Sequence, residues 1–176
     1  MARSLTGLLC ATLAAGPLHA QPAPAPSRPK VEAVVLEGQV LDEAQLLSAQ
    51  GKQQLDTELT LLKQQLGPDF VVVTVVSLGN QPIDQFSLYL STLWQIGDAQ
   101  RQDGVLMLIA PNERQIRIDV GGGLKPLLTD PYCADVVRDT MLPLVRQGNM
   151  EGAIMAGAQQ LIATMRNAAT GGNNAG

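Results

Sequence analysis

The chain has 176 residues, with 12 basic and 16 acidic side chains and a formal net charge of −4, and this length suits a single domain with one core. The acidic balance argues against nucleic acid as a partner, because Lys and Arg contacts to phosphates supply most non-specific affinity. The composition also restricts the chemistry, since the only histidine is His19 and the two cysteines are Cys10 and Cys133.

The first twenty residues have the layout of a secretory signal peptide. Arg3 supplies a positive start, residues 5–15 form a short apolar stretch, and Ala20 is a small residue at the expected cleavage site. The stretch is too short for a spanning helix, so we expect a periplasmic or secreted protein without a transmembrane segment in the mature chain. Cleavage would remove His19 and Cys10 and, with Arg3, change the formal charge from −4 to about −5.

The mature chain would then contain no imidazole and a single thiol. Ser-His-Asp and Cys-His catalysis are excluded, as are zinc sites of the Cys/His type. A bound metal would need oxygen ligands, which favours calcium, magnesium or manganese.

The N-terminal half begins with a leader and a helix. Residues 21–30 are rich in Pro and Ala and are typical of an extended leader, and the domain is expected over residues 31–167. The apolar residues 34–36 predict a short strand. Ser48 is a suitable N-cap for a helix whose leucines recur at helical spacing and which stops at Gly67.

Two apolar runs without alternation follow, residues 70–78 and 104–110, and each is typical of a strand buried on both faces. A helix between them is predicted to begin near Pro82 and to end before Gly97. Apolar and charged side chains alternate over residues 116–120, which predicts a half-exposed strand that forms a hairpin with the strand before it.

The C-terminal part is predicted to be helical. One helix begins near Pro131 and is interrupted around Pro143, and a second begins after Asn149. Residues 168–176 have the composition of a disordered tail. Helices that alternate with buried strands predict an α/β/α sandwich.

The loop Gly121-Gly122-Gly123 lies between the last predicted strand and a helix, where phosphate-binding loops also occur. A dinucleotide fingerprint requires a further glycine at the position of Pro126, and the Walker pattern is absent, so we expect no nucleotide. Positive φ at the end of a strand is the simpler explanation for at least one glycine. Cys133 and Arg138 are one residue short of the spacing in thiolate phosphatases, so Cys133 is predicted to be a small buried hydrophobe.

Aspartates gather in the loops around the predicted strands. Carboxylates from several loops can converge on a calcium ion. Each also has a structural explanation, because Asp130 before Pro131 is a good N-cap, acids suit turns, and a strand aspartate can pair with Arg117 or Arg114. Composition and spacing alone favour that explanation. The acids are Asp42, Asp98, Asp103, Asp119 and Asp130.

The stretch "WQIGDAQRQDGVLMLIAPNERQIRIDVGGGLKPLLTD" resembles the signature of the TPM-domain family. It contains, in order, Trp-x-Ile-Gly, an Asp-Gly before an apolar strand, Arg-x-x-Arg-Ile-Asp-Val-Gly and Leu-Thr-Asp. The segments "VLDEAQLLS" and "MLPLVRQGNMEGAIMAG" are similar to the family's opening and closing segments. The resemblance therefore extends from about Val31 to about Arg166.

The resemblance implies a Rossmann-like α/β/α sandwich, in which helices flank a small mixed sheet, located outside the cytoplasm in bacteria and in the plastid lumen. Its members include thylakoid-lumen acid-phosphatase-like proteins, photosystem II repair proteins, calcium binders and accessory modulators of membrane complexes. Carried over to this chain, the metal ligands would be Asp42, Asp103 and Asp130, with Asp98 and Asp119 as weaker candidates.

The glycine loop departs from the family pattern. The family's Gly-Tyr-Gly-Leu-Glu reads Gly-Gly-Gly-Leu-Lys here, which puts Gly122 in place of an aromatic residue and Lys125 in place of an acid. A cation beside carboxylates opposes metal binding by charge repulsion. We expect the loop to lie at the rim of an acidic cleft.

Two functions follow from the resemblance, and a purely structural partner domain without a ligand is a third possibility. We favour a periplasmic binding or accessory module that uses the cleft, with or without calcium, to recognise a membrane or envelope protein. The alternative is a metal-assisted acid phosphatase. An ion held by Asp42, Asp103 and Asp130 would orient a phosphomonoester and polarise the attacking water, and Arg114 or Arg117 would neutralise charge. Without histidine, carboxylates would have to transfer protons, which favours the binding module.

Overall fold

The computed structural model describes residues 36–171, so the predicted signal peptide and leader lie outside the described residues. Strands alternate with helices in the first part of this range, and helices follow in the second. In chain order the elements are β1 (Val40–Asp42), α1 (Ala49–Leu66), β2 (Asp69–Thr74), α2 (Ile83–Leu93), β3 (Gly104–Ala110), β4 (Gln115–Val120), α3 (Asp130–Asp135), the π-helix η2 (Val136–Met141), α4 (Leu142–Arg146) and α5 (Met150–Gly171).

The four strands form one sheet in the order β1-β2-β3-β4. β1, β2 and β3 run parallel, and β4 pairs antiparallel with β3. Every residue of β3 is buried, which explains its continuous apolar sequence. β4 is an edge strand, and its residues from Ile116 to Val120 are half-buried, so the predicted half-exposed hairpin strand is confirmed.

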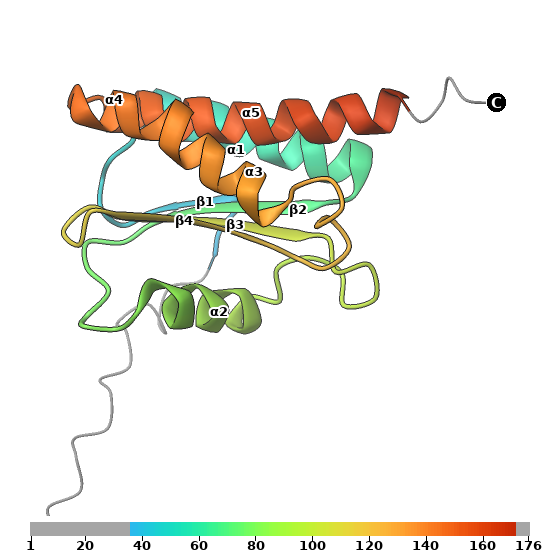
Figure 1. The fold of residues 1–176 in the computed structure, drawn as a ribbon, viewed down its shortest axis with the longest axis horizontal. Helices are drawn as coiled ribbons and strands as arrows, with labels where there is room; N and C mark the ends of the chain where they lie inside the picture. Colours follow the sequence, from blue (N-terminus) through green and yellow to red (C-terminus); the bar gives the residue numbers. More distant parts are fainter. Residues whose placement is uncertain (1–35, 172–176) are drawn as a thin grey trace, which may run out of the picture.

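Helices cover both faces of the sheet (Figure 1). Alternate residues of a strand point to opposite faces, and the buried residues accordingly form two clusters. Val72 and Met107 face α1, α5 and the α3–α4 segment, whereas Val73 and Leu108 face α2. The predicted α/β/α sandwich with a small mixed sheet is therefore confirmed.

The boundaries of α1 follow its local sequence signals. The Ser48 side chain accepts a hydrogen bond from the backbone N–H of Gly51 at 3.0 Å, and Gly67 at φ 98° ends the helix. The strand predicted at residues 34–36 is not found at Leu36, because the first strand begins at Val40. Residues 34 and 35 lie outside the described range.

Three other predicted boundaries differ from the structure. β2 ends at Thr74, and Val76 beyond it is 49% exposed. The interruption expected around Pro143 begins earlier, because residues 136–141 form the π-helix η2. In a regular α-helix a proline ring clashes with the carbonyl four residues before it, which favours such an irregular turn here. α5 extends to Gly171, so residues 168–171 of the predicted tail are helical. No helix within residues 36–171 is both long and apolar enough to cross a membrane.

Candidate functional site

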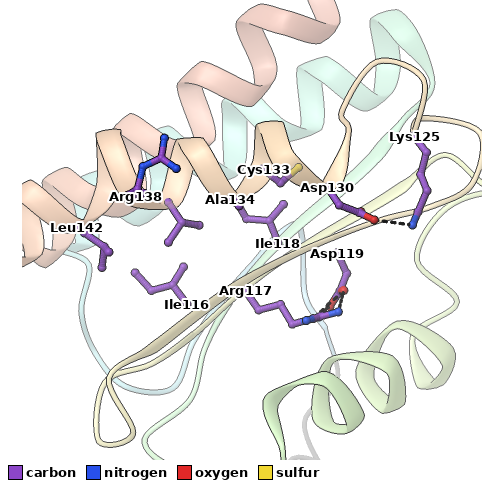
Figure 2. A pocket seen from close by; sticks show the side chains of 11 residues that line it. Ile116, Arg117, Ile118, Asp119, Lys125, Asp130, Cys133, Ala134, Arg138 and Leu142 are labelled. Carbon is purple, nitrogen blue, oxygen red and sulfur yellow. Dashed lines mark hydrogen bonds and ion pairs between the residues drawn. The ribbon is translucent and has the colours of Figure 1, made fainter.

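A hollow opens on each face of the edge strand β4. A groove of about 980 Å³ lies between α2 and β4, and we call it the α2 groove. A cavity of about 510 Å³ lies between β4 and the α3–η2 segment, and we call it the α3 cavity. Figure 2 shows the Arg117 and Asp119 side chains on the α2 side of β4, opposite Ile116 and Ile118, as alternation along a strand requires.

The α2 groove combines an apolar wall with acidic groups. Leu88 of α2 lines it and is 68% exposed. Asp84, Asp98 and Asp119 contribute carboxylates, and Arg117 contributes a cation. Arg117 lies 2.5 Å from Asp84 and 2.8 Å from Asp119, measured between guanidinium nitrogen and carboxylate oxygen. Its hydrogen bond to Asp119 raises the pKa of Arg117, and the carboxylates outnumber the cation.

The glycine loop forms one end of the α2 groove. None of Gly121, Gly122 and Gly123 has a positive φ, so the expectation of positive φ is wrong for these residues. A Cβ atom at Gly121 or Gly123 would collide with the backbone carbonyl oxygens of Gln102 and Arg101. The Gly123 N–H donates to the Gln102 carbonyl at 3.0 Å. Glycine is required here because two backbone segments approach closely.

Asp98 and Asp103 belong to a hydrogen-bonded turn before β3. The Asp103 carboxylate accepts hydrogen bonds from the Asp98 N–H at 2.8 Å and from Arg101 Nε at 2.7 Å. Asp98 accepts from the N–H groups of Arg101 and Gln100, and these bonds lower the pKa of Asp98. Burial raises the pKa of Asp103, but its hydrogen bonds and the Arg101 charge together hold this pKa below the usual value. Asp98 therefore lines the groove, and Asp103 holds the Asp98 turn in place.

Asp130 and Lys125 lie beside the α3 cavity and form an ion pair of 3.2 Å (Figure 2). The N-cap of α3 is Thr129, whose side chain accepts a hydrogen bond from the Tyr132 N–H at 3.2 Å. The predicted N-cap role of Asp130 is thus wrong by one residue. Cys133 is 5% exposed, which confirms it as a buried small hydrophobe, and burial raises its pKa to about 11. A thiol with such a pKa is a poor nucleophile.

Asp42 lies at the other end of the sheet. Asp42 pairs with Thr74, the last residue of β2. Asp103 directly precedes β3, whose first residue pairs with the first residue of β2. A six-residue strand such as β2 spans about 16 Å. The Asp42 carboxylate accepts hydrogen bonds from the N–H groups of residues 46 and 47. Arg114, in the hairpin turn after β3, is also remote from Asp103.

The family model of the TPM domain matches residues 40–164 of this chain. The chain belongs to the TPM domain family. No curated protein is similar to the chain at a significant level.

Solved structures share the fold of this TPM domain. The solution structure of the N-terminal domain of a P. gingivalis protein has a TM-score of 0.71 and 27% identity, and the match covers 80% of this chain and 89% of that one. The BA42 protein of Bizionia argentinensis has a TM-score of 0.56 and 14% identity, with 68% and 81% covered. The N-terminal domain of cg2496 from Corynebacterium glutamicum has a TM-score of 0.56 and 17% identity, with 76% and 88% covered. The last two similarities concern the fold alone.

The described part of this TPM domain does not fit an ion held jointly by the predicted ligands. Asp42 and Asp103 lie at opposite ends of the sheet, and Asp130 pairs with Lys125. Within residues 36–171, no three His, Cys, Asp or Glu side chains are grouped closely enough to hold a metal. An ion at Asp103 would also have to replace the Arg101 hydrogen bond. Calcium binding stays a prediction.

Sequence reasoning missed the α2 contribution to the TPM domain groove. Asp84 and Leu88 are one helical turn apart and both line the groove. The available signal was the outer face of the predicted helix, which carries a large leucine opposite its buried side. A single aspartate beside exposed apolar residues matches no motif that predicts a site.

Proposed function

We propose that this protein is an exported binding module that uses the α2 groove to hold a segment of a cell-envelope protein. The observation that carries the proposal is the lining of the groove, in which Leu88 is 68% exposed beside the carboxylates of Asp84, Asp98 and Asp119. A protein segment with apolar and basic side chains would complement this lining. The signal-peptide layout of residues 1–20 supports export.

The state of the candidate acids favours binding over acid catalysis. A general acid must be protonated at the working pH, whereas the pKa of Asp103 lies below its usual value. Both carboxylate oxygens of Asp103 also accept hydrogen bonds within the chain. Neither feature prevents the groove from binding a protein segment.

The phosphatase alternative has a direct assay. Hydrolysis of an aryl phosphate by the purified protein should be compared with hydrolysis by the Asp103→Asn, Asp130→Asn double variant. Under the binding-module proposal we expect no difference between the two rates. A large loss of rate in the double variant would favour the enzyme instead.

The binding proposal is tested by site-specific photo-crosslinking. A photoreactive amino acid replaces Leu88 in one variant and Leu61 in a control variant; Leu61 is 41% exposed on α1, on the other side of the sheet. Both variants are irradiated with detergent-solubilised envelope membranes of the source organism. We expect a product from position 88 that excess unlabelled protein suppresses and that position 61 does not give. Identical products at both positions, or none at position 88, would contradict the proposal.

A further inference from the structure

β4 ends the sheet on one side, so half of its backbone hydrogen-bonding groups face away from β3. The Gly121 N–H donates to the Gly104 carbonyl at 2.8 Å, and hydrogen-bonded pairs alternate with non-bonded pairs along an antiparallel ladder. With the observed register, the odd-numbered residues of β4 bond to β3. The N–H and C=O groups that face outward are those of Ile116, Ile118 and Val120.

The charges on β4 do not prevent a second copy of the strand from pairing with this edge in every register. Edge strands commonly carry charges because self-pairing then brings like charges together. On the α2 side, however, β4 carries Arg117 and Asp119, whose side chains are 37% and 30% exposed. Since these charges have opposite signs and stand two residues apart, the register decides whether a second copy of the strand is repelled.

Only registers that match outward-facing residues form backbone hydrogen bonds with a second copy of β4. In the antiparallel register centred on Ile118, each Arg117 lies opposite Asp119 of the other copy, and Ile116 lies opposite Val120. This register also uses all outward-facing residues of both strands. Registers centred on Arg117 or on Asp119 place like charges directly opposite each other, which is destabilising.

We propose that two copies of the protein pair antiparallel through β4, in the register centred on Ile118, to form a two-fold symmetric dimer. The α2 groove and the α3 cavity lie along the two faces of β4. The strand contact is small, so the dimer is weak and depends on concentration. The pairing does not require the proposed function to be correct, although Arg117 and Asp119 also line the α2 groove.

The test uses charge reversal in the purified protein, with sedimentation equilibrium up to about 1 mM, a range suited to small interfaces. Arg117→Asp alone and Asp119→Arg alone each place like charges opposite one another, and we expect dimerisation at least about tenfold weaker. An equimolar mixture of the two variants restores opposite charges at both positions, so it should form a heterodimer. Arg114→Asp, an exposed change in the hairpin turn, is the control and should dimerise like the original protein.

Each outcome bears on the proposal. Dimerisation of the original protein, loss of it in both single variants and recovery in their mixture would support pairing in this register. A protein that stays monomeric at about 1 mM overturns it. So does a dimer that both charge reversals leave unchanged, because such a dimer uses another surface. The melting temperatures of the two single variants show whether both are folded. If both are folded and their mixture still fails to associate, the proposed register is wrong.

Discussion

Asp103 stabilises the turn before β3 through hydrogen bonds. The sequence around Asp103 is equally compatible with this structural role and with metal binding. The residue is 7% exposed, and its carboxylate accepts hydrogen bonds from the Asp98 N–H and from Arg101 Nε. The pKa of Asp103 is lowered in the folded protein. Its contribution to stability is therefore fully present above the unfolded pKa of about 3.9, and it is lost as the pH falls through the folded pKa.

We expect Asp103→Asn to lower the free energy of unfolding by about 1–3 kcal/mol at pH 7, because two partly buried hydrogen bonds to a charged acceptor are weakened. The difference from the original protein should shrink below about pH 4. Urea titrations at both pH values measure it. Asp139→Asn serves as the control, since that carboxylate lies on the surface beside Arg138, and little change is expected. A cost that stays constant down to pH 3 would contradict the electrostatic explanation.

Lys125 offers a test of whether charge prevents calcium binding. Its ammonium group pairs with Asp130 at 3.2 Å, and both line the α3 cavity with Asp119. We expect Lys125→Glu to bind calcium more tightly than the original protein, because a carboxylate replaces a repelling cation beside Asp130. Calorimetric titration of chelator-treated protein measures the affinities. Lys52→Glu, an exposed change on α1, alters the net charge equally and should not increase the affinity.

The glycine loop is defined by the groups that lie against it. The Gly123 position faces the backbone carbonyl of Arg101, whereas the Gly122 position faces the movable side chain of Gln102. We expect Gly123→Ala to destabilise the protein by about 1–3 kcal/mol, because the backbone must shift. Gly122→Ala, the matched control, should cost much less because only a side chain has to move. Equal midpoints in urea for the two variants would contradict this explanation.

Elements with strong local signals were predicted well from the sequence. The apolar run of β3 and the cap of α1 both appear where the sequence indicates, because continuous burial and capping act over a few residues. The separation of Asp42 from Asp103 was not predictable in the same way. It depends on which end of the sheet each residue occupies, and strand direction places the two at opposite ends.

The two connections between parallel strands, β1 to β2 and β2 to β3, have an unusual combination of handedness. β1, β2 and β3 are adjacent, parallel and in sequence order, yet α1 and α2 cover opposite faces of the sheet (Figure 1). Two right-handed crossovers that step in the same direction place both helices on one face, so one crossover here is left-handed. The sequence patterns of α1 and α2 contain no information on this choice. The position of the α2 groove could not be predicted for the same reason.

Both cores share the strands β2 and β3, so we expect the two helical layers to unfold together. Phe86 of α2 is fully buried against one face of the sheet, and Cys133 is buried on the opposite face. Phe86→Ala should cost about 3–5 kcal/mol. If unfolding is cooperative, alkylation of Cys133 in the native protein should become at least about a hundredfold faster, since every 1.4 kcal/mol changes the open population tenfold.

The comparison separates cooperative unfolding from local unfolding of one layer. Thr57→Ala, an exposed change on α1, is the control and should leave the alkylation rate nearly unchanged. Phe86→Ala could instead lose part of its helical circular dichroism at a lower temperature than the original protein while Cys133 stays protected from alkylation. That result would mean that α2 unfolds separately from the rest. In that case α2 would be the mobile wall of the groove. A groove with one wall of low stability could admit a ligand without disturbing the α1–α5 layer, so the labelling result also bears on how a protein segment would enter.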